Sequence, residues 1–123
     1  MTLLEELYRD IGGDYSQALR VLRVEKLLDK HIRKLTKNGV IDNLLDAGRA
    51  MDPTQLFEAA HAAKGVCANL GLTGLANAAS ELAEEYRPGN PRHLSDAEVA
   101  DRLRAIEGLY RTTAEGIRRY EEA

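Results

Sequence analysis

Apolar residues recur at intervals of three and four along most of the chain, which is the spacing of a helix face. In the first third this pattern predicts helices over residues 3–11, 18–35 and 40–48, the second with a bend near residue 23. Gly12-Gly13 and Asn38-Gly39 interrupt the pattern, and glycine just after an apolar helical segment typically ends the helix. No segment reads as a strand.

A helix start lies in the middle of the chain, at Asp52-Pro53. An aspartate can cap the first turn, and proline is favoured at the first helical position because its missing N–H would have no partner there. This helix is expected to run to about Leu70 and to end at Gly71. A further helix over 72–86 follows at once, so the two should be antiparallel neighbours whose alanines allow close approach.

The last predicted helix follows a loop at Pro88-Gly89-Asn90-Pro91. Ser95 and Glu98 have the spacing of a capping box, in which each side chain accepts a hydrogen bond from the other residue's backbone. From Val99 to Tyr120 the apolar positions alternate at four and three residues, a stripe about 32 Å long at 1.5 Å per residue.

Together these elements predict an all-α protein, an antiparallel up-and-down four-helix bundle with additional N-terminal helices. We interpret residues 1–123 as one domain, with 1–23 as an N-terminal helical extension and 24–121 as the bundle. The composition supports helix, because aromatic residues make up 5% of the chain and proline occurs three times.

Charge and composition narrow the classes of partner. The formal net charge of −3 argues against a nucleic-acid partner, which requires a concentrated basic stripe. The cations between Lys26 and Lys37 are interrupted by the acid Asp29, and we interpret them as a solvated helix face. The single cysteine, Cys67, suits a reducing compartment, and no stretch resembles a signal peptide or a membrane span. We expect a cytoplasmic monomer that does not contact a membrane.

His61 lies on the polar side of the helix that starts at Pro53. At about 100° per residue, the apolar residues fall on one face and His61 points the other way. The apolar face comprises Leu56, Ala59, Ala60, Ala63, Val66, Cys67 and Leu70. The residues that share its side are Phe57, Glu58, Lys64, Gly65 and Ala68. The pattern therefore predicts an exposed imidazole at the centre of a docking surface.

Lys64 and Gly65 fit a site that carries phosphate. A neutral imidazole is a nucleophile that can attack phosphorus. Lys64 lies less than one turn from His61, so its ammonium can reach phosphoryl oxygens on the ring and stabilise their charge. Glycine inside a helix costs about 0.5–1 kcal/mol relative to alanine. The close approach of a partner would explain this cost at Gly65.

The string His61-Ala62-Ala63-Lys64-Gly65, followed by Asn69-Leu70-Gly71, resembles the signature of histidine-containing phosphotransfer (HPt) domains of phosphorelays. The order of elements from about Val24 to Tyr86 is also similar to that family. The resemblance implies a helical bundle with the histidine exposed halfway along one helix. The chain departs from the family at Ala62 and Ala63, where a hydroxyl residue and a large aliphatic residue are common.

The resemblance also implies a role for each matched residue. His61 would accept the phosphoryl group through Nε2, Lys64 would stabilise it, and Gly65 would leave room for a partner. The other predicted docking residues are Phe57, Glu58, Ala68 and Asn69. The implied reaction is reversible transfer between His61 and the aspartate of a response-regulator receiver domain, free or within a hybrid histidine kinase. The partner would supply the Mg²⁺.

The same features predict a phosphocarrier rather than an enzyme. The chain lacks a glycine-rich nucleotide loop, so autophosphorylation from ATP is not expected, nor is a cofactor of its own. Its three histidines lack metal-ligand spacing, so no metal site is expected. One alternative is a helical adaptor that binds receiver or kinase domains without carrying phosphate. Another is a structural bundle that oligomerises through the Val99–Tyr120 stripe, although that stripe is more simply the domain's own core.

Two side chains carry separate expectations. His31 falls in an apolar arc, so it is expected to be packed and hydrogen-bonded. The arc is formed by Val24, Leu27, Leu28, Ile32 and Leu35. For Phe57 two orientations remain open, one facing a partner and one turned sideways into the bundle.

Overall fold

The computed structural model describes all 123 residues and contains seven α-helices and no strand, which confirms the predicted all-α class. None of the helices is long and apolar enough to cross a lipid bilayer. In chain order the helices are α1 (Leu3–Ile11), α2 (Tyr15–Leu22), α3 (Glu25–Lys34), α4 (Val40–Ala50), α5 (Pro53–Asn69), α6 (Thr73–Tyr86) and α7 (Asp96–Glu122).

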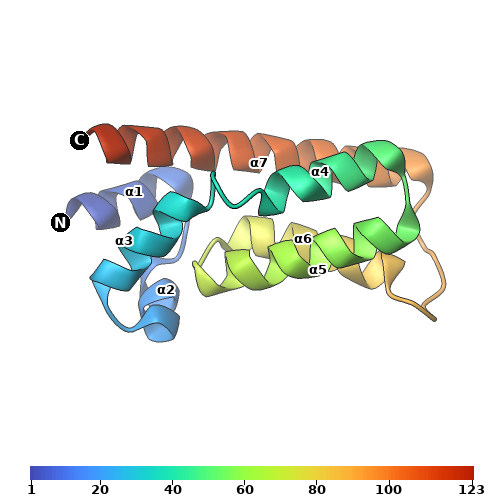
Figure 1. Cartoon of the computed structure of the whole chain (residues 1–123), viewed down its shortest axis with the longest axis horizontal. Helices are drawn as coiled ribbons and strands as arrows, with labels where there is room; N and C mark the ends of the chain where they lie inside the picture. Colours follow the sequence, from blue (N-terminus) through green and yellow to red (C-terminus); the bar gives the residue numbers. More distant parts are fainter.

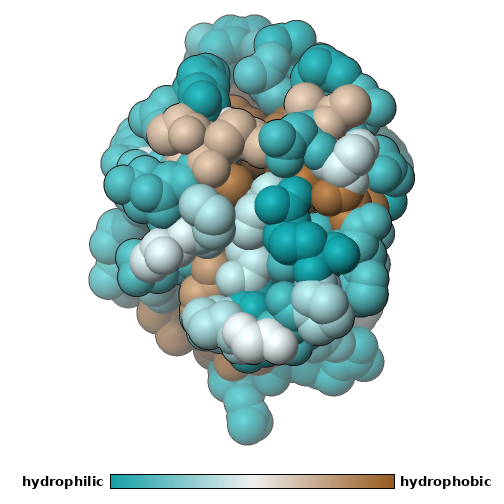
Figure 2. All heavy atoms as spheres, turned by 90° about the vertical axis from the view of Figure 1, so that its right-hand side faces the viewer, coloured by the Kyte–Doolittle hydropathy of each residue, from teal (hydrophilic) through white to brown (hydrophobic).

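The helices α4 to α7 form an antiparallel up-and-down four-helix bundle (Figure 1). They contact one another in ring order, α4 with α5, α5 with α6, α6 with α7 and α7 with α4, so α5 lies diagonally across from α7. The tight turn after α5 makes α5 and α6 the most extensively packed pair. Figure 2 views the end with the α4–α5 and α6–α7 connections, where the surface is mostly hydrophilic with small, separate apolar areas.

Side-chain caps set the first residues of α5 and α7, the two bundle helices whose starts were predicted from capping residues. The Asp52 carboxylate accepts a hydrogen bond from the Gln55 N–H at 3.0 Å, and Pro53 occupies the first turn of α5. At α7 the Ser95 hydroxyl accepts from the Glu98 N–H at 3.1 Å, while the Glu98 carboxylate accepts from the Ser95 N–H at 3.0 Å. These bonds satisfy backbone donors that the helix itself leaves free, so both predicted starts are confirmed.

The apolar stripe of α7 belongs to the core of the domain, as expected if it does not serve as an oligomerisation surface. Val99, Ile106, Thr113 and Ile117 are buried, and the remaining stripe residues Leu103, Tyr110 and Tyr120 pack partly buried against the core. Because α7 is much longer than α4, its last turns continue past the start of α4 and pack against α1 (Figure 1).

The expectation of one bent helix over 18–35 is wrong, because two separate helices meet at Arg23. This residue has φ 75° and ψ −41°, which ends α2 sharply, and the extended Val24 then begins α3. The two halves of the apolar pattern serve different neighbours. Ala18 of α2 packs at the turn that joins α5 to α6, whereas α3 contacts α7.

The expectation for His31 is also wrong, because the chain changes direction at Arg23. His31 is exposed and makes no side-chain hydrogen bond. The rotation of α3 after Arg23 directs Leu28, Ile32 and Leu35 into the core. Leu27, 42% exposed, and His31 are left on the outer side of the helix. Apolar spacing alone could not distinguish these two sides of α3.

The N-terminal helices cover one end of the bundle. The buried Tyr8 hydroxyl of α1 donates a hydrogen bond to the Leu70 carbonyl at 2.6 Å, and the Asp14 N–H donates to the Gly71 carbonyl at 2.7 Å. Both bonds end at the turn between α5 and α6. They therefore hold the C-terminal end of α5, the helix that carries His61, against α1 and α2.

The helix α3 is fastened to the C-terminal end of α7 and lies outside the four-helix ring. The Tyr120 hydroxyl donates to the Asp29 carboxylate at 2.5 Å, and the Arg33 guanidinium donates to the same carboxylate at 2.8 Å. These bonds, that from Tyr120 above all, hold the pKa of the Asp29 carboxyl below its ordinary value. Arg33 also lies over the Tyr120 ring, with its guanidinium carbon 4.9 Å from the ring centroid.

Candidate functional site

The helix α5 presents His61 to solvent because its opposite face is fully used in the core. Leu56, Ala60, Ala63 and Cys67 are each 0% exposed, and His61 lies on the exposed side. Burial raises the pKa of the Cys67 thiol to about 12, so Cys67 is a small hydrophobic core residue, as expected. The exposure of His61 predicted from the helical wheel is confirmed.

Phe57 lies one turn before His61 and stacks on it. The ring centroids are 5.7 Å apart and the planes differ by 24°. Phe57 is partly buried and packs against the core, so it combines the two orientations that the sequence left open. Its ring supports the imidazole from one side, which restricts the directions in which the imidazole can point.

Lys64 is partly buried and makes no hydrogen bond or ion pair within the chain. Its positive charge nevertheless acts on Glu84 of α6. The Arg87 guanidinium, which hydrogen-bonds the Glu84 carboxylate at 2.6 Å, holds the pKa of that carboxyl below its ordinary value, and the charge of Lys64 lowers it further. The ammonium of Lys64 is therefore available to an anion that arrives beside His61.

Arg87 and Glu84 are neighbours of the site that the sequence analysis missed. The Arg87 guanidinium carbon lies 5.6 Å from the centroid of the Phe57 ring, the ring that stacks on His61. A signal was available in the tight turn after α5, because antiparallel helices bring together positions equally distant from their turn. The rotation of α6 about its axis determines which of its side chains face Phe57, and the sequence pattern does not give this rotation.

Gly65 has no packing role inside this chain. It is exposed, and a Cβ atom added to it would meet nothing within 4 Å. Ala68 and Asn69 are also exposed on the following turn. The surface beyond His61 toward the C-terminus of α5 is therefore low and open, which is the condition for close approach of a partner's backbone.

Glu58 lies on the other side of His61, toward α4. It lines a shallow groove of about 410 Å³ between α4 and α5, together with Ala59 and Ala62 of α5 and the polar Asn43 and Asp46 of α4. Glu58 is exposed and makes no ion pair, as expected of a solvated neighbour. The predicted docking residues thus occupy one exposed side of α5.

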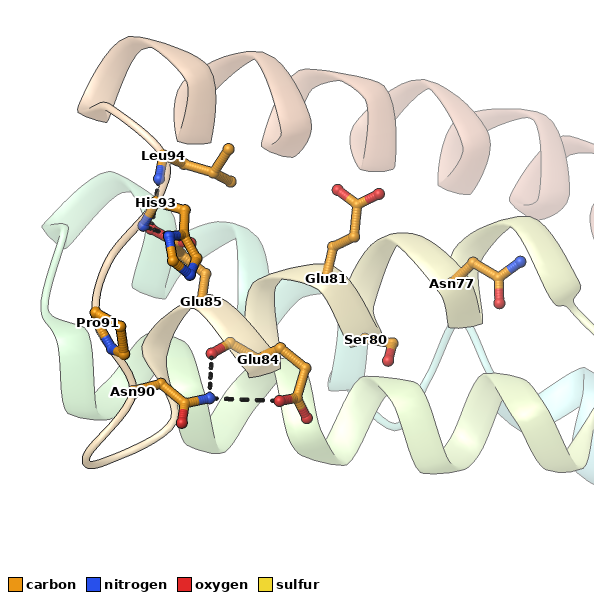
Figure 3. Close-up of a pocket in the computed structure, with 9 residues that line it drawn as sticks. All are labelled: Asn77, Ser80, Glu81, Glu84, Glu85, Asn90, Pro91, His93 and Leu94. Carbon is orange, nitrogen blue, oxygen red and sulfur yellow. Dashed lines mark hydrogen bonds between the residues drawn. The ribbon is translucent and has the colours of Figure 1, made fainter.

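A cavity of about 730 Å³ lies apart from His61, between α6 and the connection to α7 (Figure 3). Glu84 and Glu85 line it, and Asn90 donates a hydrogen bond to the Glu84 carbonyl at 3.2 Å. Its acids are held by partners within the chain, for example Glu85 by Arg92 at 2.9 Å. No group of three or more His, Cys, Asp or Glu side chains is placed to hold a metal ion.

Comparison with known proteins identifies the family. The family model for the Hpt domain matches residues 3–112 of the 123-residue chain. The search of curated proteins and the search of solved structures find no match. The matched segment contains α1 to α6 and most of α7, and the turns of α7 beyond it include those that contact α1 and α3. The chain belongs to the Hpt domain family.

Proposed function

We infer that this protein is a phosphorelay intermediate that accepts a phosphoryl group on His61 and returns it to the aspartate of a receiver domain. The observation that carries this proposal is the combination of an exposed imidazole, an unpaired ammonium at Lys64 and an open surface at Gly65. Each is explained by transfer between two proteins, and none by the packing of this chain.

The transfer proceeds by in-line displacement at phosphorus. The lone pair of the neutral imidazole Nε2 forms the N–P bond while the bond from phosphorus to the aspartyl oxygen breaks, and the carboxylate leaves. The resulting imidazolium loses the proton on Nδ1 to solvent. Lys64 balances the charge on the phosphoryl oxygens as the group arrives and while it resides on the ring. The Mg²⁺ for this reaction is assigned to the receiver domain.

The side chains around His61 orient the ring and supply no proton transfer. Phe57 holds the imidazole plane by stacking, and Arg87, just after the end of α6, lies against Phe57. Restricting the ring to productive orientations reduces the entropy that must be lost when the partner docks. The protein thus acts as a phosphocarrier, consistent with its family, and we assign it to the cytoplasm as a monomer.

The experiment is incubation with a phosphorylated receiver domain, followed by mapping of the phosphate. We expect label at His61 that is acid-labile and base-stable, as a phosphoramidate should be. His61→Gln should remove it without loss of helicity, because exposed substitutions usually change stability by less than about 0.5 kcal/mol. His31→Gln and His93→Gln, which change the other two exposed histidines, should retain the label.

The alternative, a helical adaptor that binds receiver or kinase domains without phosphate, makes a different prediction in the same experiment. It requires binding of the receiver domain with no label on any histidine. Label that persists in His61→Gln would contradict the assignment of His61. A mass measurement in solution that gave a dimer would contradict the assignment as a monomer.

A further inference from the structure

Three large apolar side chains are exposed together where α2 turns into α3. Val21 is 40% exposed, Val24 50% and Leu27 42%, in a chain whose other exposed large apolar residues are Met1, Leu3 and Leu109. Burying such side chains would be favourable, at about 25 cal/mol per Å² of apolar surface. Contiguous exposed apolar residues rimmed by polar ones are typical of interaction surfaces.

The backbone at this corner is held in an unfavourable conformation. Arg23, between Val21 and Val24, has φ 75°, a region that side-chain-bearing residues rarely adopt. Only one other residue besides glycine, Met51, has a positive φ. Strain of this kind persists where the surrounding structure enforces it, and it is concentrated at functional positions. Here the strained residue is an exposed arginine that lies between two exposed valines along the chain.

Positive charge is concentrated on the same segment. From Arg20 to Lys37 the chain carries seven lysines and arginines and two acids, whereas the rest of the chain carries ten and eighteen. Arg33 and Lys37 form ion pairs with acidic side chains. The remaining cations of the corner and of α3 are exposed and make no ion pair: Arg23, Lys26, Lys30 and Lys34.

The outer side of α3 connects this corner to the helix of His61. Leu27, His31 and Lys34 follow one another at intervals of four and three and therefore form one stripe. His31 and Lys34 line a groove of about 310 Å³ whose other wall includes Val66 and Asn69 of α5. The groove thus ends at a predicted docking residue two turns beyond His61.

The corner lies on the same side of the molecule as the exposed side of α5 (Figure 1). α4 packs above α5 and α6 behind it in Figure 1, so the exposed side of α5 faces downward and toward the viewer. α2 and its connection to α3 project below the level of α5 at the lower left of the same view. His61 and Asn69 are separated by about 12 Å along the helix at 1.5 Å per residue.

We propose that the α2–α3 corner, defined as Val21, Arg23, Val24, Lys26, Leu27, Lys30 and Lys34, is a second contact for the receiver domain that docks on His61. This inference rests on the proposed function. A stable protein interface covers about 800 Å² on each partner, roughly 30 Å across, so a docked partner contacts much more of the surface than the helical turn around His61. The corner sets which receiver domains bind, and the imidazole reacts with all that dock.

The charge of the corner favours a receiver domain over other anionic partners. A receiver domain with acidic side chains beside the face that docks on His61 would complement the unpaired cations of α3, and such complementarity speeds association. An anionic membrane would match the charge, but segment 20–37 contains no aromatic residue, whereas membrane-surface helices commonly use Trp or Phe. The position of the corner beside the exposed side of α5 also suits a partner that must reach His61.

The test compares phosphate transfer to variants of the corner, using the phosphorylated receiver domain that labels His61. We expect the double variant Val24→Ser/Leu27→Ser and the double variant Lys30→Glu/Lys34→Glu to reduce transfer at subsaturating receiver at least tenfold. Transfer at saturating receiver should remain within twofold, because His61 itself is unchanged. The Lys30→Glu/Lys34→Glu variant should also lose most of the dependence of transfer on salt.

Matched controls are available on α7, diagonally across the bundle from α5. Leu109 has the same 42% exposure as Leu27, and Arg119 is an exposed cation that makes no ion pair. Leu109→Ser and Arg119→Glu should transfer at the wild-type rate. Retained helicity in all variants would show that the exposed substitutions leave the fold intact.

The outcomes separate this inference from the proposed function. If the wild-type chain takes no phosphate from any receiver domain, the proposed function fails and the inference with it. If the wild-type chain is labelled and both corner variants are labelled equally fast at low receiver concentration, only the inference is overturned. It is also overturned if the corner variants lose binding to anionic phospholipid vesicles while phosphate transfer is unchanged.

Discussion

The ring of Phe57 stacks on the imidazole of His61, with 5.7 Å between centroids and 24° between planes. Arg87, the residue that follows α6, lies over the same phenyl ring, at 5.6 Å from its centroid, and is itself held by Glu84. The orientation of the proposed phosphoacceptor is thereby linked through one aromatic side chain to the neighbouring helix. A side chain held in this way reaches its partner with less loss of conformational freedom.

Replacing Phe57 should therefore slow phosphate transfer without removing the phosphorylation site. For Phe57→Leu we expect the rate at saturating receiver domain to fall about tenfold, since modest misplacement of a reacting group costs that much or more. Phe57→Tyr keeps the stacked ring and should transfer at close to the wild-type rate. Rapid-quench measurement of labelled protein gives both rates. Equal rates for Phe57→Leu and the wild type would show that stacking does not orient His61.

Gly65 should lower the stability of the fold and at the same time allow phosphate transfer. An exposed glycine inside a helix is less favourable than glutamine by about 0.5–1 kcal/mol, and no atom of this chain obstructs a side chain there. Gly65→Gln should therefore raise the free energy of unfolding by that amount while reducing transfer from the receiver domain by obstruction. Urea denaturation and transfer kinetics on one preparation measure the two effects.

The control for Gly65 is Gly108 of α7, which is also exposed and also has open space at its Cβ position. Gly108→Gln should give the same gain in stability and leave transfer unchanged. A Gly65→Gln variant that transferred as fast as Gly108→Gln would contradict the close-approach explanation of Gly65.

Most of the candidate site could be predicted from the sequence because it lies on a single helix. The cap at Asp52 sets where α5 begins, and the buried side that includes Ala60 and Ala63 then fixes where His61 points. No tertiary information is needed for either step. The stripe of α7 was predictable for the same reason.

The parts that were missed depend on how elements meet. Arg87 approaches Phe57 only because of the rotation of α6 in its pairing with α5. The outward position of His31 follows from the backbone turn at Arg23, and nothing in the apolar spacing marks an arginine as the residue that adopts φ 75°. Contacts between helices decide both features, so local pattern could not supply them.

Gly71, which closes the sequence pattern after His61, is required for folding and not for chemistry. Its φ is 67°, and a Cβ atom there would overlap the backbone carbonyl of Asp14. Gly71→Ala should lower the free energy of unfolding by about 3 kcal/mol, from the backbone conformation and the displaced contact together. Gly12 has a similar φ of 71° with open space, so Gly12→Ala should cost only about 1 kcal/mol. Equal losses in denaturant titrations would contradict this account.

Glu85 fastens the connection between α6 and α7 as a nearly buried carboxylate, 4% exposed. It accepts hydrogen bonds from the Leu94 N–H at 2.8 Å, the His93 N–H at 2.9 Å and the Arg92 guanidinium at 2.9 Å. Burial alone would raise the pKa of this carboxyl, but these donors outweigh burial and hold the pKa below its ordinary value. The ionised form is thus favoured by folding.

The stability contributed by Glu85 should therefore be lost in acid. Because its pKa is lower in the folded chain, the contribution is complete above the ordinary glutamate pKa of about 4.3 and disappears as the pH falls through the lower folded value. Glu85→Gln should be less stable than the wild type at pH 7 by about 2 kcal/mol, and the difference should narrow below pH about 4. Glu58→Gln, which removes an exposed and unpaired carboxyl, is the control and should follow the wild-type curve. Thermal unfolding measured from pH 7 to pH 3 gives these curves, and a Glu85→Gln deficit that stayed constant over that range would show that the charge of Glu85 does not hold the connection.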